Sequence, residues 1–183
     1  IENLEGNTTF RSYETVGAMT GSNDQTPLIA GGYIFFSYNI ADSREQMKDY
    51  IKSIRDYCET YENIQPYLCV DQEGGWVSRL KKLNPKLPSN EDVAKNYDAG
   101  GAYRLYGEQA AGMKELGFDM NLAPVAEVCT EGNKDFLDGR SFGNSFQVRQ
   151  YGLACINAYE NNGIATVLKH FPGNTNTDPH TGL

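Results

Sequence analysis

The stretch Tyr67-Leu68-Cys69-Val70-Asp71-Gln72-Glu73-Gly74-Gly75 runs from an apolar segment into three polar residues and ends in two glycines. Residues 67–70 form a short, continuous apolar run, which is typical of a strand buried on both faces of a parallel sheet. The paired glycines permit backbone conformations that other residues forbid, so we expect a sharp turn directly after the strand. The stretch therefore predicts a buried strand that delivers acidic side chains to its carboxyl end.

Similar apolar runs recur on both sides of this stretch, and segments with helical spacing separate them. The further strands are expected at Tyr33–Phe36, Phe118–Leu122 and Ile164–Leu168. The helices are expected from the N-cap signal Asp42-Ser43 to about Tyr61, from about Gly101 to Leu116, and from Ser145 to Asn161. Alternating strands and helices predict an α/β fold with a parallel sheet that is covered on both sides.

Polar residues gather just after each expected strand, and their distribution separates two fold types. They are Asn39, the segment 71–79, Glu127 with Arg140, and the segment 169–180. In a (β/α)8 barrel these loops converge on one face, whereas a doubly wound sheet places its site at one switch point. No GxGxxG or Walker sequence supports a nucleotide site. We therefore expect a TIM-type (β/α)8 barrel. Because only four strands are evident, residues 1–183 are expected to form an incomplete portion of one barrel domain, truncated at both ends.

Composition narrows the possible partners. The net charge of −8 and the lack of a basic stripe make nucleic acid an unexpected partner. No apolar run is long enough to span a membrane. The cysteines Cys58, Cys69, Cys129 and Cys155 show no CxxC or Cys/His ligand pattern, so no metal site is expected. Cys69 and Cys155 fall in apolar segments and are predicted to be buried thiols. The compartment stays open between the cytoplasm and export.

Several polar residues at the strand ends are candidates for ligand binding. Asp71 could accept hydrogen bonds from two neighbouring sugar hydroxyls, or it could be a turn acid. Arg79 could reach the same ligand or pair with Asp71. Arg140 lies in a glycine-bounded loop and is either a planar donor or a surface arginine. Lys169-His170 closes an apolar strand, a costly placement that favours a binding role.

The segment Asn174–His180 has no apolar residue and is expected to be an exposed loop. It holds Asp178 and His180, two positions apart. A carboxylate near an imidazole can fix its tautomer and suit it to proton transfer at neutral pH. The alternative is a solvated loop histidine.

Taken together, these segments resemble glycoside hydrolase family 3, specifically its β-N-acetylglucosaminidase branch. The resemblance covers roughly residues 31–183 and rests on five strings in matching order. They are Gly31–Ser37 with Asn39-Ile40, Val70–Gly75, Leu122–Val128, Gly139–Gly143, and Lys169–Gly173 with Asp178-Pro179-His180.

The resemblance implies a (β/α) barrel that removes terminal β-linked N-acetylglucosamine from a carbohydrate substrate, with retention of configuration and without a cofactor. It implies that His180 is the general acid/base, oriented by Asp178, and that the nucleophile is an aspartate beyond Leu183. It also implies a set of residues that bind the sugar in the −1 subsite: Asp71, Arg79, Arg140, Lys169 and His170.

The chain departs from the family pattern in three places. Trp76 stands where a small or basic residue is usual, and it could reshape a sugar platform. The loop after Gly173 carries Asn174-Thr175 instead of a His-Gly or Tyr-Gly pair. Residues 1–30 do not resemble the family's first strand.

Two other functions fit the same residues. One is a phosphorylase of this branch, which passes the glycosyl group to phosphate. The other is a noncatalytic sugar-binding barrel, which would need neither His180 nor a downstream aspartate. A β-glucosidase of the wider family is disfavoured because those enzymes lack the Asp-x-His loop.

Overall fold

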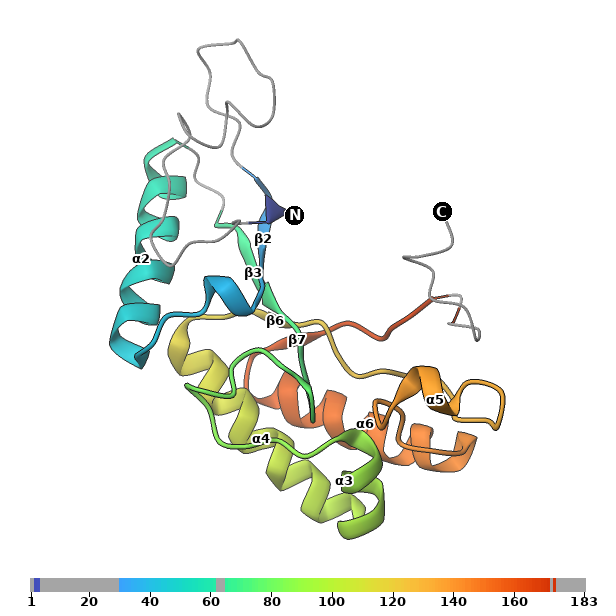
Figure 1. The fold of residues 1–183 in the computed structure, drawn as a ribbon. Coiled ribbons are helices and arrows are strands. Elements are labelled where there is room, and N and C mark those ends of the chain that lie inside the picture. Colours follow the sequence, from blue (N-terminus) through green and yellow to red (C-terminus); the bar gives the residue numbers. More distant parts are fainter. Residues whose placement is uncertain (1, 4–29, 62–64, 172, 174–183) are drawn as a thin grey trace.

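The computed structural model describes residues 2–3, 30–61, 65–171 and 173. Their centre is a five-stranded parallel sheet in which the spatial order of the strands follows their order in the sequence (Figure 1). The strands are β1 (Glu2–Asn3), β2 (Gly32–Phe35), β3 (Tyr67–Val70), β6 (Met120–Asn121) and β7 (Ala165–Thr166). This arrangement confirms the predicted α/β class with a parallel sheet.

The four predicted strands are present, and the last two are shorter than predicted. Pro124 has no backbone N–H to give to a ladder, so regular pairing stops before it. The two chain segments nevertheless stay together beyond β6 and β7, because Val125 bridges Lys169 in parallel and the Ala126 N–H donates to the Lys169 carbonyl at 2.8 Å. The edge strand β1 was not predicted, since two polar residues carry no apolar pattern.

The three predicted long helices are α2 (Arg44–Tyr61), α4 (Ala99–Leu116) and α6 (Ser145–Asn161), each joining consecutive strands of the sheet. Asp98 caps α4 by accepting a hydrogen bond from the Gly101 N–H, and Gly117 ends it in a left-handed conformation with φ 100°. Two short helices, α3 (Asn90–Asn96) and α5 (Lys134–Leu137), were not predicted.

The hydrophobic core lies between the sheet and these helices. Phe35 of β2 and Phe118 are fully buried and meet edge to face, with ring centroids 5.2 Å apart. Helices α4 and α6 pack side by side (Figure 1). Cys69 and Cys155 are buried free thiols, as predicted, and burial raises the pKa of Cys69 to about 11. None of the helices in the described part of the chain could span a membrane.

Over the described residues the sheet is open, with β1 and β7 at its edges. Closure into a barrel therefore stays a prediction. The carboxyl end of β3 continues into a small antiparallel hairpin of β4 (Gln72–Gly74) and β5 (Val77–Ser78). This hairpin and the segments after β6 and β7 bring the polar side chains together.

Candidate functional site

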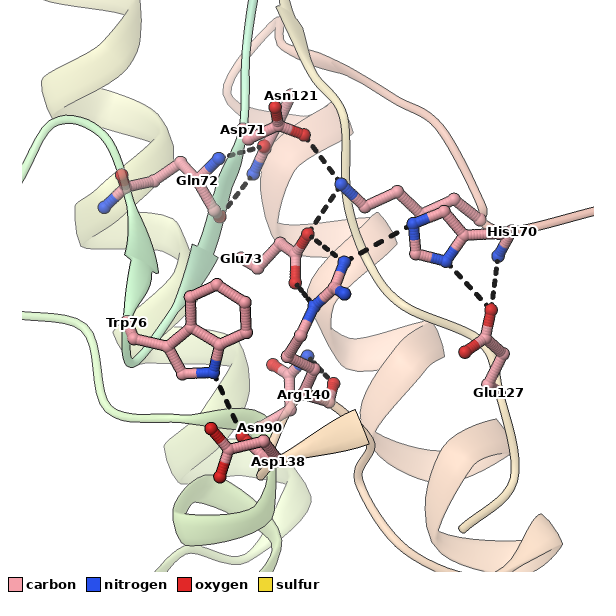
Figure 2. Close-up of polar contacts among 11 residues, drawn as sticks. Asp71, Gln72, Glu73, Trp76, Asn90, Asn121, Glu127, Asp138, Arg140 and His170 are labelled. Carbon is pink, nitrogen blue, oxygen red and sulfur yellow. Dashed lines mark hydrogen bonds and ion pairs between the residues drawn. The ribbon is translucent and has the colours of Figure 1, made fainter. Parts of the chain in front are cut away.

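Four of the seven predicted site residues meet in one ionic cluster at the carboxyl ends of the strands (Figure 2). Lys169, which follows β7, donates from Nζ to Asp71 Oδ1 at 2.6 Å. Arg140 comes from the loop before α6, and its Nη2 lies 3.4 Å from His170 Nε2. Residues far apart in the sequence are therefore gathered at the place that the strand-end argument predicted.

Glu73 is the centre of this cluster and was not among the predicted site residues. Its carboxylate accepts hydrogen bonds from Arg140 Nε at 2.8 Å and Arg140 Nη2 at 2.9 Å, and it pairs with Lys169 Nζ at 2.6 Å. The Glu73 side chain is only 1% exposed. The one sequence signal that could have identified Glu73 is its position two residues after Asp71.

Glu73 and Arg140 favour the charged form of one another. Burial pulls the pKa of Glu73 upward, but the hydrogen bonds and positive charges of Arg140 and Lys169 outweigh burial and hold that pKa below its ordinary value of 4.5. Burial likewise pulls the pKa of Arg140 down, and the hydrogen bond and charge of Glu73 raise it above its ordinary value. The bidentate contact between planar groups explains why an arginine suits this position.

The alternative interpretation of Arg140 as a surface arginine is wrong. Its side chain is only 14% exposed, and both its backbone carbonyl and its guanidinium have partners. The Asn90 Nδ2 donates to the Arg140 carbonyl at 2.8 Å, while the guanidinium lies 5.6 Å from the centroid of the Trp76 ring. The loop that carries Arg140 is thereby fixed relative to the hairpin that carries Glu73.

Glu127, which follows the bridge between residues 125 and 169, holds His170. Its Oε1 accepts from the His170 backbone N–H at 3.1 Å and lies 2.8 Å from the ring Nδ1. The sequence marked Glu127 as a polar residue after a strand but gave it no role. A cavity of about 390 Å³ opens beside this pair, with Lys169 and Phe171 also in its lining.

A buried network of amide side chains holds the backbone next to Glu73 in place. Gln72 and Asn121 exchange two hydrogen bonds of 3.0 Å, from the Gln72 N–H to Asn121 Oδ1 and from Asn121 Nδ2 to the Gln72 carbonyl. The Gln72 side chain also contacts Gln109 of α4 and the backbone of Leu80. These contacts join the ends of β3 and β6 where the strand ladder has stopped.

Of the other predicted residues, only Arg79 lies within the described part of the chain, and its guanidinium is not part of the cluster. The ion-pair partner of Asp71 is Lys169, not Arg79. The Arg79 backbone N–H donates to the Asp71 carbonyl, and Arg79 Nη1 lies 3.5 Å from Ser37 Oγ. The buried Nε of Arg79 has no acceptor within the described part of the chain. Asp178 and His180 lie outside the described residues. Within those residues, no group of three or more acidic, His or Cys side chains could hold a metal ion.

The site's chemistry suits a polyhydroxylated ligand. Carboxylate oxygens accept from hydroxyl groups and the Lys169 and Arg140 N–H groups donate to them, so closely spaced hydroxyls can be met by both kinds of partner. Charged hydrogen-bond partners that are already held in place lose little freedom when such a ligand binds.

Comparison with known proteins gives a consistent picture. The model of the Glycosyl hydrolase family 3 N terminal domain matches residues 24–183. Beta-hexosaminidase A of Pseudoalteromonas piscicida is 31% identical over 84% of this chain and 27% of its own length. A Beta-hexosaminidase of Psychromonas ingrahamii is 32% identical over 86% of this chain and 46% of its own length. The chain thus spans less than half the length of these relatives.

Solved structures match as well. A glycoside hydrolase family 3 β-N-acetylglucosaminidase from Paenibacillus sp. superposes on 82% of this chain and 29% of its own, with a TM-score of 0.72 and 28% identity. NagZ from Neisseria gonorrhoeae covers 94% of this chain and 48% of its own, with a TM-score of 0.76; at 24% identity it supports the fold alone. With the family model matching most of its length, the chain belongs to glycosyl hydrolase family 3 and carries that family's N-terminal domain.

Proposed function

We propose that residues 1–183 are part of a (β/α) barrel domain in a glycoside hydrolase that removes terminal β-linked N-acetylglucosamine with retention of configuration. The observation that carries the proposal is the buried cluster of Asp71, Lys169, Glu73 and Arg140 at the carboxyl ends of the strands. Relatives of this chain named as β-hexosaminidases support the substrate class.

In this proposal the cluster binds the terminal sugar. Within the described residues, Lys169 Nζ donates to Asp71 and Glu73, which leaves its third N–H for a sugar hydroxyl. Asp71 uses Oδ1 for Lys169 and offers Oδ2 to a second hydroxyl. His170 lines a cavity together with Lys169, and Arg140 and Arg79 complete the proposed set of sugar-binding residues. Two neighbouring hydroxyls of one sugar ring would meet an acceptor and a donor side by side.

The chemistry is proposed to follow two steps with an Asp–His pair in place of the usual carboxylic acid. An aspartate that follows Leu183 attacks C1, and the His180 imidazolium gives its proton to the departing oxygen. Neutral His180 then takes a proton from water as that water attacks C1, which frees the aspartate and restores the imidazolium. Asp178 orients the imidazole and stabilises its charged form.

The test is hydrolysis by the full-length protein of a chromogenic β-N-acetylglucosaminide and of the matching glucoside. The expected result is faster turnover of the N-acetylglucosaminide, with free N-acetylglucosamine as the product both with and without phosphate. N-acetylglucosamine 1-phosphate formed only when phosphate is present would replace the hydrolase with the phosphorylase. Sugar binding without turnover of either glycoside would favour a noncatalytic barrel.

A further inference from the structure

Trp76 is the only tryptophan in the sequence, and it lies at the turn between β4 and β5. Although the residue is large and apolar, 58% of it is exposed. The next residue, Val77, is buried, so the hairpin places one apolar side chain inside and presents the indole outside.

The hairpin that carries the indole is held in one conformation. Gly74 and Gly75 have φ values of 112° and 57°, which side-chain-bearing residues rarely adopt. A Cβ atom at Gly74 would lie 2.2 Å from the Pro88 carbonyl oxygen, so the turn packs directly on the segment before α3. The Gly75 N–H donates to the Leu87 carbonyl at 3.0 Å. The turn therefore fixes where the backbone of Trp76 lies.

The indole ring itself also has fixed partners, and one of them, Arg140, belongs to the ionic cluster. Its Nε1–H donates to the Asp138 carbonyl at 3.1 Å. The guanidinium of Arg140 lies 5.6 Å from the ring centroid, within cation–π range. Figure 2 shows Trp76 on one side of Arg140 and His170 on the other, the latter 3.4 Å from Arg140 Nη2. Trp76 therefore contacts the ionic cluster through Arg140.

We propose that Trp76 is a platform for a second sugar ring, the one joined to the terminal residue that the ionic cluster binds. The inference rests on the proposed function and adds a binding subsite to it. The C–H groups on one face of a pyranose carry slight positive charge, and the face of an indole carries negative charge. An exposed ring that is fixed before binding offers this contact at little cost in conformational entropy.

The experiment uses the full-length protein and two ligands, N-acetylglucosamine and a thio-linked β-disaccharide of N-acetylglucosamine, whose sulfur bridge resists hydrolysis. Calorimetry gives both affinities, and tryptophan fluorescence, taken as the difference from the Trp76→Phe variant, reports on the indole. We expect the disaccharide to shift the emission of Trp76 and the monosaccharide to leave it nearly unchanged. Trp76→Ala should weaken disaccharide binding by about 3- to 10-fold, the usual strength of an aromatic contact.

Two variants separate this role from folding. Trp76→Phe keeps an aromatic face but loses the hydrogen bond to Asp138, so it should retain most of the disaccharide affinity. Phe146→Ala removes another exposed aromatic ring, at the start of α6, and should change neither affinity.

The outcomes distinguish the platform from the function on which it rests. Monosaccharide binding with no tighter disaccharide binding and no fluorescence change would overturn the platform and leave the proposed function standing. An equal loss of both affinities in Trp76→Ala would also overturn it, because the indole would then act on the terminal sugar or on Arg140. Binding of neither ligand would overturn both proposals.

Discussion

Glu127 Oε1 faces His170 through two groups at once, the backbone N–H at 3.1 Å and the ring Nδ1 at 2.8 Å. A carboxylate can only accept, so Nδ1 carries a proton and Nε2 keeps its lone pair in a neutral ring. Arg140 Nη2 lies 3.4 Å from that lone pair. The pair thereby prepares Nε2 to accept a hydrogen bond, either from Arg140 or from a ligand hydroxyl.

The first prediction is that Glu127→Leu releases the His170 ring from this tautomer. For the neutral form of the ring, nitrogen NMR of imidazole-labelled protein should show the proton on Nδ1 in the parent and a mixture of both tautomers in the variant. Glu127→Gln, whose amide oxygen still accepts from Nδ1, should stay close to the parent. Resonances are assigned by loss of signal in His170→Asn. An unchanged tautomer in Glu127→Leu would show that another group sets it.

A second prediction concerns the buried carboxylate of Glu73. Glu73→Gln removes the carboxylate that pairs with the buried Arg140 guanidinium and leaves Lys169 paired with Asp71. Breaking a buried ion pair in this way should lower the free energy of unfolding by about 3–5 kcal/mol. Urea unfolding measures the change. The matched control is Glu115→Gln, because Glu115 also pairs with two cations, Arg44 and Lys48, but at the surface. The control should lose far less stability.

The third prediction is that the stabilities of the parent and of Glu73→Gln respond differently to acid. The pKa of Glu73 is lower in the folded protein than its ordinary value of 4.5. The unfolded chain therefore binds the proton more readily, and stability falls as pH drops. The stabilisation from Glu73 is fully present above its unfolded pKa and is lost as pH falls through the lower folded value. The stability gap between parent and Glu73→Gln should be constant near neutral pH and shrink below about pH 4.5. A gap that widens on acidification would reverse the assignment.

These results mark where sequence reasoning succeeds. Residues 67–70 and 145–161 match their predicted bounds because continuous apolar runs and helical spacing are local signals. One rule, that loops after parallel strands share a face, also predicts that four of the site residues come together. They are Asp71, Arg140, Lys169 and His170.

The structural features that could not be predicted from the sequence depend on contacts between distant segments. Glu73 and Arg140 are separated by 67 positions, and nothing local marks them as partners. The sequence marked Trp76 as a departure from the family pattern, but nothing in the hairpin sequence predicts its contacts with the Asp138 carbonyl and the Arg140 guanidinium. The edge strand β1 is two polar residues that pair only because β2 lies beside them.

The fourth prediction tests the binding role of Asp71. Asp71→Asn keeps the shape of the side chain but removes the charge that pairs with Lys169. Each charge-assisted hydrogen bond contributes about 1.5–3 kcal/mol, so kcat/KM for the N-acetylglucosaminide should fall by roughly 10- to 150-fold or more. The exposed Asp49 on α2 supplies the control, and Asp49→Asn should leave kcat/KM unchanged. If Asp71→Asn unfolds easily but keeps full kcat/KM, Asp71 is structural.

The last prediction separates proton transfer from binding at His180. If His180 gives a proton to the departing oxygen, His180→Ala should slow hydrolysis of substrates with poor leaving groups by about 10²–10⁴-fold, the usual contribution of general acid–base catalysis. Activated phenols leave as stable anions and need little protonation, so their first step should slow much less. Asp178→Asn should follow the same pattern with a smaller loss, because the imidazole remains. A series of aryl glycosides with graded phenol pKa values makes the comparison within one protein, and the variant's rate should depend more steeply on leaving-group pKa than the parent's. An equal loss across the whole series would assign His180 to sugar binding instead of proton transfer.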